Sequence, residues 1–258
     1  MSMSKTRIVA LIGALLLCAT SAHAQVNTER FRKQMNEDGL RGSAELYFAN
    51  RTGNSDLLSG GASLNLGWRG GVNGIIFTGR ADVGTTHSTT TINRGFVHLR
   101  GNRELSERLT WELFTQREYD RFARLDARTL LGSGPRVPLY RGEAGTIHVG
   151  IAYMAEWEQI DVAPGSGEDS SQFYHRVSGH LAASLKAGDR LTLSNTVYLQ
   201  PRWRERSDTR LLNEFSARIG MGGALSLKIA LVIRRDGDPP SGVKKVDSHL
   251  SNRLVWDF

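Results

Sequence analysis

The chain has 258 residues, which is enough for one large domain or two small ones. Its formal charge is +7, but Arg and Glu alternate along the chain, as in "RERSDTR", and this argues against a nucleic-acid-binding face. The single cysteine, Cys18, excludes an intrachain disulfide framework and a cysteine metal site.

The first element along the chain, residues 1–24, has the pattern of a cleaved signal peptide. Lys5 and Arg7 precede an apolar run at residues 8–19, and the small-x-small sequence "AHA" ends at residue 24. The run is shorter than the roughly 20 residues that a membrane-spanning helix needs. Cleavage removes Cys18 and two of the 33 basic residues, so that the mature chain has no thiol and a formal charge of +5 against its 26 acidic residues.

Residues 25–39, "QVNTERFRKQMNEDG", are polar and precede the first predicted strand. We expect them to form a short periplasmic segment. The alternative is a segment that enters the interior of the fold.

From residue 40 onward the hydropathy follows a period of two, which predicts β-strands. Within residues 172–185, Phe173 and Val177 share one face and Arg176 lies on the other, with His175 as a polar exception on the apolar face. The same pattern predicts about twelve strands, at residues 42–50, 57–68, 74–85, 91–101, 109–120, 126–134, 146–158, 172–185, 191–204, 210–221, 225–235 and 247–258. The sixth strand is poorly patterned, and Pro135 and Pro138 lie close to its end.

Strand length and loop length favour a membrane barrel over a soluble β-sandwich. A sandwich buries its apolar face against a second sheet, whereas these strands have the length of membrane strands and present Leu, Ile, Val, Gly and Ala outward. Short connections such as "KAGDR" alternate with longer ones such as "RDGDPPSGVKK", as at the two rims of an outer-membrane barrel. We therefore predict an all-β fold: an antiparallel transmembrane β-barrel of about twelve strands over residues 40–258, with both termini periplasmic.

The polar face carries charges of both signs, and we expect these charges to line the lumen. They either pair across the lumen and close it, or line a constriction with weak ion preference. Arg204, at the end of the ninth predicted strand, is assigned to the same face. The candidates for lumen closure or ion selectivity are Arg176, Arg202, Arg218, Lys228, Glu112, Glu156 and Glu214.

Large aromatic residues gather near the predicted strand ends, as in the girdles at the two membrane interfaces. The periplasmic set is Trp68, Trp111 and Trp256, and the extracellular set is Tyr119, Trp157, Phe173 and Trp203. In the final stretch, "NRLVWDF", Leu254, Trp256 and Phe258 alternate onto the lipid-facing side. This ending resembles the carboxyl-terminal signal by which the barrel-assembly machinery recognises its substrates.

The residues favour a non-enzymatic protein. A lipid hydrolase needs Ser and His within hydrogen-bond reach near the outer rim, and the same-face pair Ser178 and His180 is expected inside the lumen. An outer-membrane protease needs acidic residues and a His at the extracellular rim; Glu156 and Glu158 lie there, but His175 points toward lipid. The histidines have no metal-ligand spacing, so we expect no metal and no cofactor.

Four stretches together resemble the YdiY-like family of salt-induced outer membrane proteins, a family of unknown function. They are "GSAELYFANRTGNSD", "ELSERL…REYDRF", "LKAGDRLTLSNTVYLQPR" and "DPPSGVKKVDSHLSNRLVWDF". The shared features are a GN-S/T-D turn at residues 53–56, an "RDRF"-like turn at residues 119–122, and a "PP-x-G-x-KK-x-D" hairpin at residues 239–247. The resemblance implies a fold and an outer-membrane location, but no mechanism.

The expected function is therefore that of an integral outer-membrane protein of a Gram-negative bacterium. It is either a stress-related envelope protein or a narrow porin-like channel for small hydrophilic solutes. A lipid hydrolase and a structural barrel closed by ion pairs are the alternatives. The expected partners are outer-membrane lipids and, during biogenesis, periplasmic chaperones and the barrel-assembly machinery, with no nucleic acid; the oligomeric state is left open.

Overall fold

The computed structural model describes residues 38–51, 57–87, 89–162, 165 and 167–258, and for residues 50 and 51 the backbone alone. The predicted signal peptide, residues 25–37 of the polar segment and the predicted turn at residues 53–56 lie outside the described residues. Among the described residues, no helix is long and apolar enough to cross a membrane.

The described residues form twelve strands and one short 3₁₀ helix, η1 (Arg121–Ala123). The strands are β1 (Gly39–Arg51), β2 (Leu57–Gly70), β3 (Asn73–Thr86), β4 (Thr89–Ser106), β5 (Leu109–Asp120), β6 (Leu125–Gly142), β7 (Gly145–Ile160), β8 (Ser171–Ala187), β9 (Leu191–Pro201), β10 (Thr209–Gly222), β11 (Leu225–Arg235) and β12 (Val246–Asp257).

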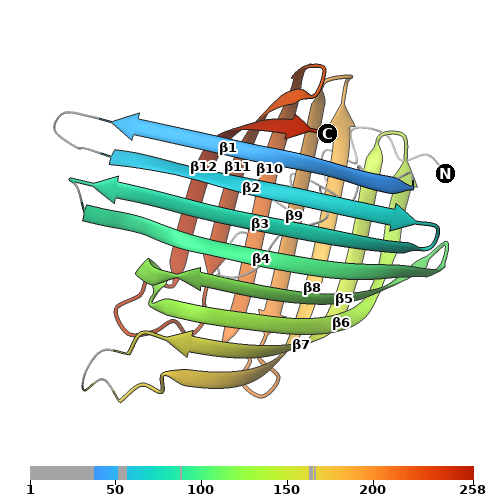
Figure 1. Ribbon diagram of the computed structural model, residues 1–258. Helices are drawn as coiled ribbons and strands as arrows, with labels where there is room; N and C mark the ends of the chain where they lie inside the picture. The colour runs from blue at the N-terminus through green and yellow to red at the C-terminus, as the bar shows by residue number, and fades with distance from the viewer. Residues whose placement is uncertain (1–37, 52–56, 88, 163–164, 166) are drawn as a thin grey trace.

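The strands close into a single antiparallel barrel in which each strand pairs with its neighbours in sequence (Figure 1). β1 completes the ring by pairing with β12, with Ala44 opposite Trp256 and Leu46 opposite Leu254. The near-wall strands cross the far-wall strands at a steep angle in Figure 1, because strands must tilt to close a barrel. The predicted antiparallel barrel of about twelve strands is confirmed.

The two rims differ in their connections. One rim has tight turns, such as residues 71–72, 107–108 and 223–224, and it also holds the start of β1 and the end of β12. The opposite rim, which we call the long-loop rim, has the connections at residues 161–170, 202–208 and 236–245. The connection at residues 87–88 also lies on this rim and is shorter than expected, because β3 and β4 extend into the stretch "GTTHSTTT".

Alternation along each strand separates an outer wall from the lumen. Outward side chains such as Leu46, Leu113 and Ile151 are exposed, whereas their neighbours in the strands are buried inside the ring. The lumen is not wholly polar: Phe114, Leu130 and Met154 form one buried cluster, and Tyr198, Leu212 and Val232 form another. Apolar side chains therefore fill part of the interior.

Gly132 on β6 leaves space for one of these apolar side chains, Phe114. A Cβ at Gly132 would come within 2.3 Å of the Phe114 ring, which is closer than atoms approach without displacement. Phe114 lies opposite Gly132 in the β5–β6 ladder, so the absence of a side chain at residue 132 leaves space for the Phe114 ring inside the lumen.

Several strand boundaries differ from the prediction, among them the ends of β4, β6 and β9. β6 continues through Pro135 and Pro138 to Gly142 instead of ending at residue 134. Its pairing with β7 skips from Ser133 to Arg136 and shifts again after Pro138, so the prolines coincide with interruptions of that ladder, where a missing N–H is tolerated.

β9, in contrast, ends at Pro201 and not at residue 204. Arg202 forms only an isolated bridge with Arg176, and Trp203 donates its N–H to the carbonyl of His175 at 2.8 Å. Arg204 is exposed in the following loop, so its assignment to the lumen face was wrong.

Candidate functional site

The most distinctive feature of the lumen is a group of buried ion pairs near the long-loop rim, which we call the inner network. It comprises three arginines and four carboxylates, Arg128, Arg176, Arg210, Glu156, Glu158, Asp208 and Asp236. The Arg210 side chain is 2 % exposed, that of Arg176 is 0 % exposed and that of Glu156 is 1 % exposed. Charges this deeply buried require partners, because desolvation of an unpaired ion is costly.

Arg210 is the centre of the inner network. Its guanidinium contacts Glu156, lies 2.8 Å from a carboxylate oxygen of Glu158, and lies 2.9 Å from a carboxylate oxygen of Asp236. Arg210 belongs to β10 and the two glutamates to β7, with two strands between them in the ring. These contacts therefore reach across the lumen and do not follow one wall.

Arg128 on β6 contacts a glutamate on each of its two neighbouring strands, β5 and β7, and also reaches across the lumen. It lies 2.6 Å from Glu158 and 2.9 Å from Glu118, and 3.7 Å from Asp236 beyond the end of β11. Arg176 on β8 extends the network sideways, because it holds both oxygens of Asp208 and lies 3.2 Å from Glu156. The inner network thus joins β5 through β8 to β10 and the loop after β11.

Two further groups of paired charges lie deeper in the barrel. Lys228 on β11 lies 2.9 Å from Glu45 on β1 and 4.0 Å from Glu214 on β10. Arg100 and Glu112, on the adjacent strands β4 and β5, lie 2.9 Å apart. Ion pairs therefore occur at more than one depth in the lumen.

All seven lumen candidates from the sequence lie on the inner face, and each has an ionic partner. Five of them are described above: Arg176, Glu112, Glu156, Glu214 and Lys228. Arg218 contacts Asp257 near the short-turn rim. Arg202 lies at the edge of the long-loop rim, 30 % exposed, where it pairs with Glu205 at 2.9 Å and stacks on Tyr174.

Sequence reasoning missed several members of the inner network. Arg128 lies in the poorly patterned sixth strand, and Asp208 and Asp236 lie in loops, where no alternation signals an inward side chain. Arg210 begins a predicted strand, and its alternation with Leu212 and Glu214 could have assigned it to the lumen. Glu158 follows the same alternation as Glu156, on the polar side of its strand, but was not named as a lumen candidate.

The loops of the long-loop rim are tied together above the inner network. Arg124, which follows η1, donates to the Ser241 carbonyl at 2.7 Å and to Glu168 at 2.8 Å. The second oxygen of Glu168 accepts the Ser241 N–H at 2.7 Å. These bonds from Ser241 and Arg124 lower the pKa of the Glu168 carboxyl to about 2. We call this arrangement of Arg124, Glu168 and Ser241 the loop clasp.

The arginines of the inner network determine the ionisation state of Asp236, in the loop after β11. Burial acts to raise the pKa of this carboxyl, but Arg210 and Arg128, with the Asp238 N–H, lower it overall. Asp236 therefore stays ionised beside the arginines that it pairs with.

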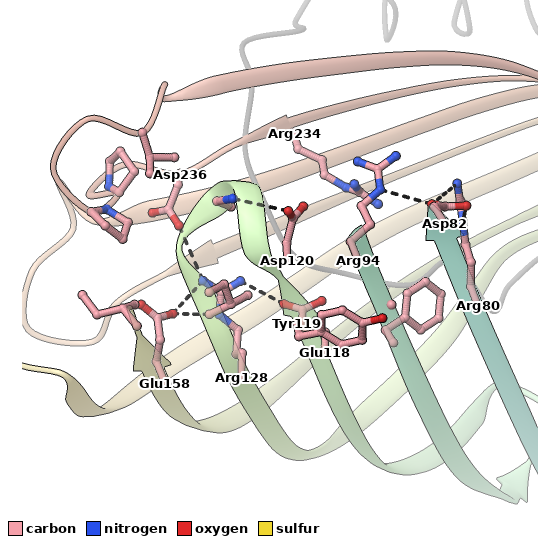
Figure 2. Close-up of a pocket in the computed structure, with 18 residues that line it drawn as sticks. Arg80, Asp82, Arg94, Glu118, Tyr119, Asp120, Arg128, Glu158, Arg234 and Asp236 are labelled. Carbon is pink, nitrogen blue, oxygen red and sulfur yellow. Dashed lines mark hydrogen bonds and ion pairs between the residues drawn. The ribbon is translucent and has the colours of Figure 1, made fainter. Parts of the chain in front are cut away.

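A cavity of about 360 Å³ lies on the β4, β11 and β12 side of the long-loop rim, and we call it the vestibule. Its lining includes Arg94, Asp120, Phe122, Arg234, Val243 and His249. A smaller cavity of about 70 Å³ adjoins it and shares Arg94 and Arg234 (Figure 2). Both cavities are walled by the "YDRF" turn at one side and by the "PP-x-G-x-KK" hairpin at the other.

Six of the seven predicted girdle residues lie on the outer wall, and the seventh, Trp203, is exposed in the loop after β9. The exposed fractions of the seven lie between 37 % and 66 %: Trp68, Trp111, Tyr119, Trp157, Phe173, Trp203 and Trp256. Leu254 and Phe258 are also exposed, and the Trp256 and Phe258 rings lie 5.3 Å apart. Phe258 exchanges two backbone hydrogen bonds with Gly42, so the last residue takes part in closing the barrel.

The residues considered for catalysis lie on both sides of the barrel wall. Ser178 accepts a hydrogen bond from Gln200 at 3.2 Å inside the lumen, where His180 packs against Tyr198. His175 lies on the outer wall and shares a 2.6 Å hydrogen bond with Tyr153. No cluster of three or more His, Cys, Asp or Glu side chains suited to a metal ion occurs in the described part of the chain.

Comparison with solved structures finds similar barrels. The translocator domain of the autotransporter NalP from Neisseria meningitidis matches with a TM-score of 0.53 and 12 % identity, over 89 % of this chain and 92 % of that chain. The NanC porin matches with a TM-score of 0.51 and 11 % identity, over 84 % of this chain and 98 % of that chain. At these identities the likeness extends to the fold of outer-membrane barrels.

A comparison with curated proteins finds no significant match. Residues 44–258, which include nearly all of the barrel, match a family described as protein of unknown function, DUF481, and the chain belongs to that family.

Proposed function

We propose that this protein is an integral barrel of the bacterial outer membrane whose lumen is held closed near its extracellular rim by the inner network. The long-loop rim is then extracellular and both barrel ends are periplasmic, in keeping with short periplasmic turns in this class of barrel. The fold shared with outer-membrane barrels and the signal-peptide pattern of residues 1–24 support this location.

One observation carries the proposal of a closed lumen: arginines from one wall meet carboxylates from the other. Arg210 reaches Glu158 across two intervening strands, and Arg128 reaches Asp236 from the far side of the ring. An open aqueous channel at this level would leave these side chains hydrated and apart, whereas here they are buried and in contact. The polar lumen of a barrel of this size can be filled by its own side chains.

Such a barrel acts as a structural element of the envelope in its resting state. The resemblance to salt-induced outer membrane proteins supports a role under salt stress, where a sealed barrel adds no leak to the membrane. Growth of a deletion strain at high salt tests this role: we expect a defect that the wild-type chain restores, and equal growth of both strains would contradict the role.

Conductance across planar bilayers tests the closure. We expect wild-type protein to give few or no steps, and a variant with Arg128→Ser and Arg210→Ser to give resolved steps, because two long side chains no longer cross the lumen. Arg190→Ser, in an exposed turn at the opposite rim, is the matched control and should behave as wild type. Frequent large steps from wild-type protein would refute the closure.

A narrow channel for small hydrophilic solutes is the second candidate. The vestibule and the smaller cavity that adjoins it favour this function, because the smaller cavity is lined by Arg128, Glu158 and Asp236 of the inner network. In this case wild-type protein conducts in small steps that the double variant enlarges.

A lipid hydrolase is tested by measuring lipid release by wild-type protein and by the His180→Ala variant. Release by the wild type that is lost in the variant would establish that class.

A further inference from the structure

The vestibule brings together arginines that the inner network does not use. Arg94 reaches it from β4 and Arg234 from β11, and Figure 2 shows the two side chains extending toward the same space from opposite walls. Arg80 lies beside Arg94 on the neighbouring strand, β3 (Figure 2). Three guanidinium groups therefore gather on one side of the long-loop rim.

Of the carboxylates near these arginines in the described part of the chain, Asp82 is the one that forms an ion pair with them. Arg80 and Arg94 share a single partner, Asp82, at 2.8 Å and 3.1 Å from the same oxygen. Within the described part of the chain, the Arg234 guanidinium has neither a hydrogen bond nor an ion pair. Two carboxylates line the same space: Asp120, whose Oδ1 accepts the N–H groups of Phe122 and Ala123, and Asp247, which lies opposite Arg234 in the β11–β12 ladder.

The groups around the vestibule add further donors. His249 on β12 lies on its wall, and the Nε2 atom of this ring is buried without a hydrogen-bond partner among the described residues. Lys244 of the loop 236–245 also lines the space. Two partly buried guanidinium groups that face each other repel, and an oxyanion between them would satisfy both with charge-assisted, forked hydrogen bonds.

We propose that the vestibule is a binding site for a small soluble oxyanion, a phosphate, sulfate or carboxylate group held between Arg94 and Arg234. A cavity of about 360 Å³ is at the lower end of the range for small-molecule sites, so it suits a compact anion with a modest organic part. The roof of the site is the "PP-x-G-x-KK" hairpin, which the loop clasp fixes to the turn after β5 through Arg124 and Ser241. This gives a shared role to two turns that the sequence singles out.

The site does not depend on whether the barrel conducts. It lies outside the inner network and opens toward the long-loop rim, so an anion can bind with the lumen closed. The oxyanion has two possible sources: a free solute, or the headgroup of a phosphate-bearing lipid. Enclosure by the barrel wall and the loops favours the free solute.

Calorimetric titration of the refolded full barrel in detergent tests the proposal, with inorganic phosphate, sulfate and acetate as probes. Sodium chloride at the same ionic strength controls for screening, which acts on any exposed charge. We expect saturable binding of at least one oxyanion to wild-type protein. Heats that do not differ between every oxyanion and chloride would overturn the proposal without any variant.

Arg234→Gln is expected to weaken the binding about tenfold or more, because it removes a charge and a forked donor pair. Arg190→Gln removes the same charge at the opposite rim and should bind as wild type does. Heat-modifiable migration on gels verifies that each variant is folded. Wild-type affinity in folded Arg234→Gln would also overturn the proposal.

Mixed micelles that contain phosphatidic acid identify the source of the anion. Displacement of bound phosphate by the lipid assigns the site to a headgroup, and failure to displace it assigns the site to a soluble anion. Both results require that phosphate binds between the arginines.

Discussion

Replacing Arg210 by methionine is expected to lower the free energy of unfolding of the barrel by about 3 kcal/mol. Methionine keeps a long side chain, so the change removes the charge and the hydrogen bonds with little loss of volume. The side chain is 2 % exposed and contacts three carboxylates, those of Glu156, Glu158 and Asp236. All three lose a partner at once.

The magnitude follows from what remains around each carboxylate. Glu158 keeps Arg128 at 2.6 Å and Glu156 keeps Arg176 at 3.2 Å, but Asp236 keeps only Arg128 at 3.7 Å. Removing one partner of a buried ion pair costs about 3–5 kcal/mol, and two retained arginines place the cost at the lower end. A second change, Asp236→Asn, should recover about 1 kcal/mol or more, since it removes the least compensated charge.

Urea unfolding of the protein refolded into lipid vesicles measures this difference, with tryptophan fluorescence as the signal. Four of the five tryptophans lie on the outer wall, so their emission reports insertion into lipid, and the fifth, Trp203, is exposed in the loop after β9. Arg190→Met, in an exposed turn, is the control and should change stability by less than about 0.5 kcal/mol. A loss below about 1 kcal/mol for Arg210→Met would refute the argument, because it would equate the inner network with an exposed surface pair.

Three further predictions concern the end of the chain, the loops and the lumen. Deletion of Phe258 should reduce outer-membrane assembly, followed by surface labelling in cells, far more than the stability of folded protein in detergent; equal losses would make the residue merely structural. The folded-state pKa of Glu168 is lowered to about 2, so its contribution to the clasp is present above its ordinary value and is lost as pH falls toward 2; Glu168→Gln should speed hydrogen exchange of the Ser241 N–H at neutral pH, and unchanged exchange would contradict the clasp. In a conducting background, Lys228→Ala or Arg218→Ala should move the reversal potential toward cation preference, and an unchanged potential would exclude these residues from selectivity.

The local pattern of the sequence was sufficient for the wall of the barrel. A period of two is a property of neighbouring residues, so it assigned Leu254, Trp256 and Phe258 to the outer wall and Arg253 to the lumen, where the structure places them. The same pattern was misleading at the end of β6, where the pairing continues past two prolines, and at the end of β9, where the alternation continues past the last strand residue. Local periodicity contains no information on ladders that tolerate an interruption.

The ion pairs of the inner network could not be predicted from the sequence. Arg210 and Glu156 are 54 positions apart and lie on strands that do not touch, and Asp208 and Asp236 come from loops. Which charges meet across a lumen depends on the number of strands, their tilt and their stagger, and these quantities are set only when β1 meets β12. The sequence alone determined that this chain forms a barrel with a charged interior, and the closed ring decided that the charges meet and leave Arg94 and Arg234 facing a cavity of their own.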